Sequence, residues 1–444
     1  MTNMNDIYHA RRQRLMAHMQ SGIAIIPTAP EVRRNGDAYH PFRFDSHFHY
    51  LTGFAEAEAV LVLVAGPAIN GAEKNNASQA ILFCQEKDHE REIWDGFIYG
   101  PAAAREKFGF DAAFPIALLD AKLLEFMGNQ QTIYYPLGLH AAWDERILSL
   151  RAKVQMQARS GIAAPESLQD VRVALSEMRL IKDSHEIDTM RRAANISAAA
   201  HIRAMRATRP GMMEYEIEAE LWYEFRKNGA QAPAYTSIVA GGGNACVLHY
   251  ISNNAPLRDG DLLLIDAACE LDGYASDITR TFPINGKFSA AQKDVYEIVL
   301  AAQLAAIAAA TPKGYWNDPH DVALRVLAQG FIDLKLCTGT VDAVIESGDY
   351  KKFYMHRTGH WLGKDVHDVG AYKIAGQWRA LQPGMVLTVE PGCYIRPAEN
   401  IPQDLWNIGI RIEDDVAITA QGCEVLSKNA PKTVADIEER MRHA

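Results

Sequence analysis

Two aspartates flank a strong turn signal. Asp266 ends one apolar run, Asp277 lies at the start of the next, and Asp272-Gly273 separates them. An Asp-Gly pair between two such runs is typical of a two-residue β-hairpin turn. This turn pairs position 266 with position 279, so we expect both aspartates on one face, with β-carbons within about 8 Å of each other. Carboxylates that close repel unless cations lie between them; a hairpin with two solvated aspartates is the alternative.

Two glutamates and an arginine add to this pattern near the end of the chain. Glu390 ends the alternating run 385–390, and Pro391-Gly392 stops the strand immediately after it. Arg411 and Glu413 alternate with the isoleucines at 408, 410 and 412, so both should project from the face opposite the isoleucines. An exposed strand end is an equal alternative for either glutamate taken alone.

Histidines are concentrated in the same part of the chain. Three lie within twelve residues and a fourth comes from an earlier segment: His356, His360, His367 and His249. The spacing of the first two resembles a helical metal-binding pair, but Gly359 and Gly363 disfavour a helix, and no H-E-x-x-H motif is present. We therefore expect a site built on loops and strands. For each histidine taken alone, a purely structural role is the alternative to a role in this site.

Two aspartates, two glutamates and a histidine form an oxygen-rich ligand set. Such a set suits Mn²⁺, while Co²⁺, Fe²⁺ and Zn²⁺ are possible by affinity. Four anions also balance two divalent cations, which removes most of the repulsion within the cluster. Two metal ions about 3.5 to 4 Å apart acidify a water that bridges them, so these residues predict a two-metal hydrolytic site.

The elements that must position this site begin near residue 183. Asp183 and Glu186 form a capping-box pattern at the start of a helix with apolar steps of three and four, which ends at Pro210-Gly211. A second helix stops at Asn228-Gly229, and strands follow up to Phe282.

The same order then repeats. Ser289 and Gln292 form a second capping box for a long helix that runs to Pro312, and Asp318-Pro319 starts another helix with Asp318 as its cap. Strands fill the rest. We therefore expect an α+β domain with two similar halves, each in the order helix, helix, strands.

The N-terminal part has a different character. Runs at 23–26, 59–64 and 80–83 are predicted to be buried strands of an α/β layer, and the Asn-rich stretch 70–78 is predicted to be a surface loop. The pattern changes near Glu177. We therefore place an α/β domain at residues 1–176 and the α+β domain at residues 177–444.

The composition excludes several classes of protein. Lys and Arg number 45 against 55 Asp and Glu, a net charge of −10, and no basic run is present, so we expect small molecules or peptides rather than nucleic acid as partners. No segment has the pattern of a secretory signal or a membrane span. The six cysteines are scattered without a C-x-x-C pair, which favours reduced packing thiols in a cytoplasmic protein.

Six segments carry recognisable motifs. They are LIDAACELDGYASDITRTFP (264–283), HWLGKDVHD (360–368), PGMVLTVEPG (383–392), GIRIEDD (409–415), FRFDSHFHYLTGF (42–54) and EAVLVL (58–63). These segments resemble the Xaa-Pro aminopeptidases (aminopeptidase P), which are pita-bread metallopeptidases like prolidase, creatinase and methionine aminopeptidase. The resemblance covers most of the chain. It implies an aminopeptidase P-type α/β domain at residues 1–176 and an α+β pita-bread catalytic domain at residues 177–444.

The resemblance also implies a dinuclear metallo-hydrolase, usually with manganese. The five metal ligands would be Asp266, Asp277, His360, Glu390 and Glu413. A hydroxide bridging the two ions would attack the carbonyl carbon before proline, and so release the N-terminal residue from peptides with proline in second position. Relatives often assemble as dimers or tetramers, which implies a homo-oligomer here.

Further residues would act on the substrate. Glu390 would take a proton from the hydroxide and return it to the proline nitrogen. His367 and His249 would donate to the carbonyl or oxyanion. His356 would help to form the proline pocket, and Arg411 would bind the carboxylates from outside the metal pair.

Two positions call for separate expectations. Arg357 follows the first histidine of the H-x-x-x-H loop, where family members commonly have a small residue. Its long side chain should either point to solvent or alter the pocket beyond proline. Trp94 resembles a residue that, in some members of the family, can reach the active site of a neighbouring subunit. We favour the alternative that Trp94 is an ordinary half-buried aromatic residue.

Three other kinds of pita-bread protein share parts of this pattern. Prolidase shares every ligand but cuts only dipeptides, and the match at residues 42–54 argues against it. Creatinase works without metal and lacks this ligand set. A non-catalytic pita-bread module that binds proteins would typically have lost ligands, whereas this chain keeps all five.

Overall fold

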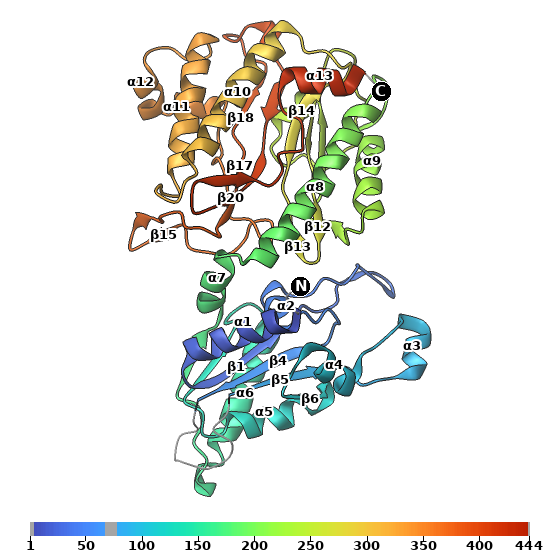
Figure 1. Ribbon diagram of the computed structural model, residues 1–444, viewed down its shortest axis with the longest axis vertical. Helices are drawn as coiled ribbons and strands as arrows, with labels where there is room; N and C mark the ends of the chain where they lie inside the picture. The colour runs from blue at the N-terminus through green and yellow to red at the C-terminus, as the bar shows by residue number, and fades with distance from the viewer. Residues whose placement is uncertain (1–3, 67–77, 443–444) are drawn as a thin grey trace. The chain divides into compact units, whose positions relative to one another are not determined.

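The chain folds as two units in a computed structural model that describes residues 4–66 and 78–442. The first unit is Met1–Met178 and the second is Arg179–Ala444 (Figure 1). Apart from Ser78, the expected surface loop at residues 70–78 lies outside the described residues. None of the described helices combines the length and the apolar character needed to cross a membrane.

The first unit is a six-stranded mixed sheet with helices on both faces. The strand order is β6-β5-β4-β1-β7-β8. Its elements are α1 (Met4–Met19), β1 (Gly22–Pro27), β2 (Arg33–Asn35), β3 (Ala38–Tyr39), α2 (Ser46–Thr52), β4 (Val60–Ala65), β5 (Gln79–Cys84), α3 (His89–Asp95), α4 (Gly100–Phe108), β6 (Ala112–Pro115), α5 (Leu119–Met127), β7 (Thr132–Tyr135), α6 (Ala141–Gln155), β8 (Ser167–Asp170) and α7 (Arg172–Leu180), whose last two residues belong to the second unit. The strands expected at 23–26, 59–64 and 80–83 are β1, β4 and β5, so the α/β class is confirmed.

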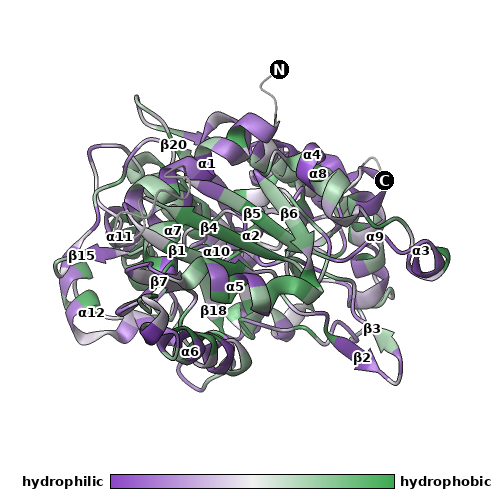
Figure 2. Ribbon diagram, turned by 90° about the horizontal axis from the view of Figure 1, so that it is seen from below, coloured by the Kyte–Doolittle hydropathy of each residue, from purple (hydrophilic) through white to green (hydrophobic). Residues whose placement is uncertain are grey.

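Both faces of this sheet are buried, which explains why its central strands are apolar at nearly every position. Ala24 and Ile26 of β1 belong to one core, with residues of α1, α2 and α4. Ile23 and Ile25 belong to the other core, with residues of α5 and α6. Figure 2 shows the apolar character of β1, β4 and β5.

One short helix of the first unit departs from expectation. Trp94 of α3 is 87 % exposed, so the expected half-buried position is wrong for the single chain. Ile93 and Phe97 beside it are exposed as well. The helix buries none of its residues and starts from the cap Asp88, whose side chain accepts hydrogen bonds from two backbone N–H groups.

The second unit has two halves in which helices precede strands, which confirms the pita-bread fold class. The second half has a third helix, α12, that the expected order helix, helix, strands does not include. Its first half contains α8 (Ser184–Ala207), α9 (Glu214–Lys227), β9 (Ala232–Pro233), β10 (Ile238–Gly241), β11 (Leu262–Asp266), β12 (Cys269–Leu271), β13 (Tyr274–Ala275) and β14 (Thr279–Pro283). Its second half contains α10 (Ala290–Ala309), α11 (Asp318–Asp333), α12 (Val341–Ser347), β15 (Lys373–Ile374), β16 (Gln377–Trp378), β17 (Val386–Val389), β18 (Gly392–Ile395), β19 (Ile408–Arg411), β20 (Asp414–Ile418) and β21 (Cys423–Val425), and α13 (Val434–Arg442) follows. Within this unit, α8 and α9 lie on one side of the strands and α10 and α11 on the other (Figure 1).

The helix starts follow the sequence signals with one exception. Capping boxes are present at Asp183 and Ser289, as predicted. The cap of α11 is Asn317 and not Asp318. Asp318 is already helical, and its carboxylate accepts from the N–H of Tyr315 at 2.7 Å instead of capping the next turn. The helix α10 ends at Ala309, before the expected stop at Pro312.

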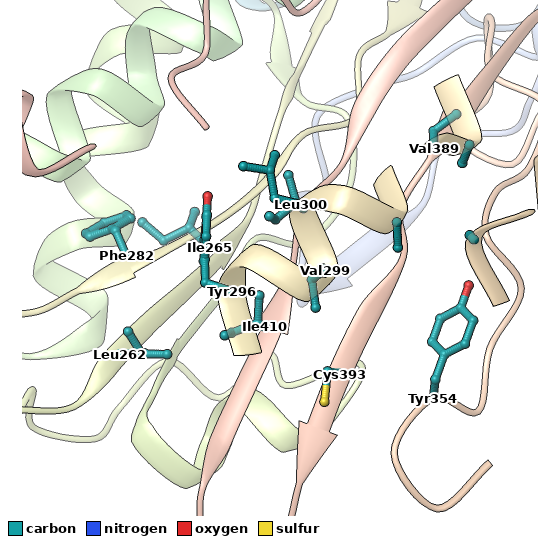
Figure 3. Close-up of a cluster of buried hydrophobic side chains, with 14 of the residues drawn as sticks. Leu262, Ile265, Phe282, Tyr296, Val299, Leu300, Tyr354, Val389, Cys393 and Ile410 are labelled. Atoms are coloured by element: carbon teal, nitrogen blue, oxygen red, sulfur yellow. The ribbon is translucent and has the colours of Figure 1, made fainter. Parts of the chain in front are cut away.

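The core of the second unit lies where α10 packs against the strands of both halves. Figure 3 shows part of it, with side chains from α10, β11, β14, β17, β18 and β19 in one cluster. All six cysteines of the chain are free thiols and five of them are buried, as expected for packing residues.

Candidate metal centre

The hairpin that carries the two aspartates has the expected register. Asp266 of β11 lies opposite Thr279 of β14. The turn residues Asp272 and Gly273 both have positive φ, at 52° and 74°, as a type I′ turn requires. The hydroxyl of Tyr235 lies 2.6 Å from Oδ1 of Asp266 and 2.6 Å from Oδ1 of Asp277. The two carboxylates therefore converge on one point.

The loop that precedes β17 places His360 and Glu390 next to each other. The N–H of Glu390 donates to the carbonyl of Thr358, and the N–H of Thr388 donates to the carbonyl of His360. The loop runs so close to β17 that a Cβ on Gly359 would lie 2.1 Å from the carbonyl oxygen of Thr388. Only glycine fits at position 359. This explains the presence of one of the two glycines that disfavour a helix in the sequence.

His360 faces the carboxylates through one ring nitrogen. Its Nε2 lies 3.3 Å from Oδ2 of Asp277 and 3.8 Å from Oε1 of Glu390. Its Nδ1 lies 2.9 Å from the carbonyl oxygen of Trp361, which fixes the ring and favours the proton on Nδ1 when Nε2 binds a metal. The ring of His367 packs edge-on against that of His360, with centroids 4.3 Å apart.

Arg411 and Thr279 form hydrogen bonds with the carboxylates of the acidic cluster. Nη2 of Arg411 donates to Oδ2 of Asp266 at 2.6 Å, and Nε donates to the hydroxyl of Thr279 at 3.1 Å. That hydroxyl donates to Oε2 of Glu413 at 2.6 Å. Nη1 of Arg411 reaches the hydroxyl of Tyr394, which also lies 2.8 Å from Nε2 of His356.

All nine site residues proposed from the sequence line a single cavity of about 660 Å³. They are Asp266, Asp277, His360, Glu390, Glu413, His249, His356, His367 and Arg411. The other lining residues are mostly apolar, including Leu248, Ile251 and Val366, and they also include Arg357. A cavity with one acidic end and apolar walls suits a short peptide whose charged amine enters first.

The acidic end of the cavity is electrostatically strained. Burial, and then the charges of neighbouring acids, raise the pKa of Glu413 well above its usual range. Burial raises the pKa of Glu390 to about 7, although His360 and Arg411 oppose the shift. Burial raises the pKa of Asp266 as well. Burial alone would lower the pKa of His360, but its hydrogen bond to Asp277 and the negative charges nearby raise it to about 9.

These residues fit divalent cations. Asp277, His360 and Glu413 each offer one ligand atom, and the three atoms lie within 4.8 Å of one another. Cations here would relieve the repulsion that raises the carboxylate pKa values, and would displace the proton from His360. The donors are hard carboxylate oxygens with one imidazole, as expected for Mn²⁺ or a neighbouring first-row ion.

Sequence reasoning missed several residues that hold this centre together. Tyr235 and Tyr394 contact it from segments outside the quoted motifs, and Asp415 is the last residue of the motif 409–415 but was not singled out; the N–H of Asp277 donates to Oδ1 of Asp415 at 3.1 Å. Thr279 carried a usable signal, because it lies two positions after Asp277 and so on the same face of an extended segment.

A buried ion-pair network holds the segment that bears His367. Asp368 accepts from Nη2 of Arg179 at 2.5 Å and from Nζ of Lys182 at 2.9 Å, and all three side chains are 1 % exposed. Arg179 also donates to Asp365, which is half-exposed at 38 %. The two cations lower the pKa of Asp368 to about 2, although burial opposes the shift.

Comparisons with known proteins agree with this geometry. Residues 188–420 match the model of metallopeptidase family M24, which implies divalent metal ions. Residues 8–134 match the N-terminal domain of aminopeptidase P.

Individual relatives match over nearly the whole chain. The chain is 42 % identical to the Xaa-Pro aminopeptidase of Escherichia coli, covering 98 % of this chain and 97 % of that protein. It is 43 % identical to the Xaa-Pro aminopeptidase of Haemophilus influenzae, with coverages of 98 % and 96 %. The solved structure of the Pseudomonas aeruginosa aminopeptidase PepP superposes with a TM-score of 0.95 at 49 % identity, covering 99 % and 98 % of the two chains. The chain therefore belongs to metallopeptidase family M24, in the group with an aminopeptidase P N-terminal domain.

Proposed function

We propose that this chain is an Xaa-Pro aminopeptidase, which releases the N-terminal residue from peptides with proline in second position. The observation that carries this proposal is the single cavity in which five ligand-type side chains face three histidines. Relatives above 40 % identity bear the same name over their full length, which favours this activity over that of prolidase. The retained acids and histidine argue against a non-catalytic binding module.

The metal ligands in this proposal are Asp266, Asp277, His360, Glu390 and Glu413, and the metal is manganese. When bound, two divalent ions polarise the scissile carbonyl and supply hydroxide from water near neutral pH. The catalytic domain is taken to begin at residue 177 and the N-terminal domain to end at 176.

Glu390 holds and returns the proton. Its carboxylate lies beside His360 in the cavity, and in this proposal it accepts a proton from the attacking hydroxide. The proline nitrogen must be protonated before it can leave, and Glu390 is placed to deliver that proton.

The three other histidines bind the substrate. His249 and His367 line the cavity and would donate to the developing oxyanion. His356 lies 3.7 Å from Oε2 of Glu390, and burial lowers its pKa to about 3, so it stays a neutral imidazole. A neutral ring beside the reacting bond suits the proline pocket, because the proline nitrogen has no N–H to satisfy.

The length of the substrate separates this proposal from prolidase. With Mn²⁺ present, kcat/KM for Xaa-Pro-Yaa tripeptides should exceed that for Xaa-Pro dipeptides by about tenfold or more, because residues beyond proline add binding energy that can be used in the transition state. Release of the first residue is measured by amine derivatisation, with an Xaa-Ala-Yaa peptide as the control. Dipeptides cut as well as or better than tripeptides would indicate prolidase.

Removal of the metal should abolish activity and lower stability together. Dialysis against a chelator should reduce kcat to about 1 % or less, and added Mn²⁺ should restore it. Loss of bound cations also withdraws their binding free energy from the folded state, so the Tm should fall in the same samples. Metal content, Tm and turnover are measured on each sample. A chain depleted of metal that retains full turnover would contradict the metal-dependent mechanism.

Location and assembly follow from the same proposal. We infer a cytoplasmic protein that assembles as a dimer or tetramer. The exposed apolar side chains of Ile93, Trp94 and Phe97 support the assembly, since they would be covered by a neighbouring subunit. Because the proposed substrates are peptides, we propose neither nucleic acid nor a membrane as a partner.

A further inference from the structure

One cation in the substrate cavity has no role in the mechanism described above. Two Lys or Arg side chains line the cavity, Arg411 and Arg357. Arg411 is bound to Asp266 at the acidic end. Arg357 has no carboxylate partner within residues 4–66 and 78–442. Its charge is therefore not neutralised by the protein.

Neutral groups hold Arg357 in place. Nη2 donates to the side-chain oxygen of Asn317, and Cζ lies 5.1 Å from the ring centroid of Trp378. A guanidinium carries five N–H donors in a planar fork, and Asn317 accepts from one nitrogen. The amide and the aromatic face limit the rotamers of the long side chain while leaving donors for a ligand.

The place of Arg357 next to the proposed proline pocket indicates which substrate residue it would contact. Arg357 directly follows His356, the proposed proline-pocket residue, and it is exposed whereas the metal ligands are buried or half-buried. If the peptide amine enters at the acidic end, the chain beyond proline must leave toward the open side. One further extended residue advances by about 3.3 Å, within reach of an arginine side chain.

We propose that Arg357 determines specificity by binding a carboxylate on the residue that follows proline. This inference rests on the proposed function, because it assumes that the amine lies at the metal end. The carboxylate is either the C-terminal one of a tripeptide or the side chain of an acidic third residue. Both are planar acceptors that match the guanidinium fork.

Four matched substrates test the inference and distinguish the two sources of carboxylate. They share Xaa-Pro and end in Ala-amide, Ala with a free carboxylate, Asp-amide or Lys-amide. The wild-type enzyme should favour at least one carboxylate substrate over Ala-amide by about fivefold to twentyfold in kcat/KM, mainly through KM, and should disfavour Lys-amide. Preference for free Ala alone assigns the C-terminal carboxylate, and preference for Asp-amide alone assigns the side chain.

Three variants separate a specific contact from a general charge effect. Arg357→Gln should remove the preference, and Arg357→Lys should keep part of it, because lysine retains the charge but not the planar fork. Lys373→Gln is the matched control. Nζ of Lys373 lies 4.2 Å from the ring centroid of the same Trp378, yet Lys373 does not line the cavity. This control loses the same unit of charge and should keep the wild-type ratio.

The outcomes are distinct. A wild-type enzyme that cuts all four substrates equally, or an Arg357→Gln variant that keeps the preference, would overturn the role of Arg357 while leaving the proposed function intact. Equal loss of the preference in Lys373→Gln would overturn it too, in favour of long-range charge. Absence of metal-dependent release from every substrate would overturn the proposed function and, with it, this inference.

Discussion

Replacing Glu390 with glutamine should lower kcat by about a thousandfold, within the range of about 10² to 10⁴ that general acid–base catalysis contributes. The amide cannot accept the proton from water or return it to the proline nitrogen. It also removes one negative charge from the set that faces the cations, so bound metal must be measured beside turnover. Steady-state kinetics on an Xaa-Pro-Yaa peptide at saturating Mn²⁺, with metal content by mass spectrometry, provide both values.

Glu399→Gln is the control for that variant. It makes the same chemical change nine positions along the chain, in an exposed segment between β18 and β19. We expect wild-type kcat there. A Glu390→Gln enzyme that binds metal normally and turns over within tenfold of the wild type would rule out Glu390 as the group that carries the proton.

Replacing Asp368 with alanine should cost about 3 to 5 kcal/mol of folding stability, because it leaves two buried cations without their shared carboxylate. Arg179 keeps its bond to Asp365, whereas Lys182 loses its carboxylate partner. Urea unfolding followed by circular dichroism measures the change. Asp368→Asn, which keeps the shape, gives a second reading if the alanine variant does not fold.

Asp365→Ala is the matched comparison, since it removes a partner of the same arginine from a half-exposed position. An exposed ion pair contributes little, so the loss there should stay within about 1 kcal/mol. Equal losses in Asp365→Ala and Asp368→Ala would show that burial of the network does not govern its energy.

The same carboxylate predicts how stability depends on acid. Because the folded-state pKa of Asp368 is lowered to about 2, its contribution is fully present above the unfolded value near 4 and is lost as the pH falls toward 2. The size of this term is about 2 kcal/mol at neutral pH. The Asp368→Asn variant should therefore show a smaller loss of stability than the wild type between pH 4 and pH 2.

Sequence signals between neighbouring residues were enough to predict much of the fold. The Asp272-Gly273 turn gave the register of β11 and β14, because turn type and strand pairing are properties of adjacent residues. The capping boxes at Asp183 and Ser289 likewise concern a few neighbouring residues. Asn317 replaced Asp318 as a cap because the hydrogen bond from Tyr315 competed for the carboxylate, which the sequence pattern does not disclose.

The residues of the candidate site likewise fall into those that the sequence predicted and those that it did not. Motif residues such as Asp266 and Glu413 were found because they interrupt apolar runs. Tyr235 and Asp415 were not, since their contacts join segments far apart in the chain and depend on packing alone. The exposure of Trp94 was not predicted either, because a large aromatic side chain is usually expected to be at least half-buried against its own chain.

The two-residue turn between β12 and β13 restricts how this hairpin can change in length during evolution or engineering. Strand side chains alternate with a period of two, so insertion or deletion of a single residue between 267 and 276 would rotate Asp277 to the opposite face. Paired changes within the strands preserve the partnership with Asp266, whereas a single change there requires a β-bulge to absorb it. Grafted sequences are therefore better placed at the turn Ala375-Gly376 between β15 and β16, which carries no metal ligand, as long as Trp378 and its contact with Arg357 are kept.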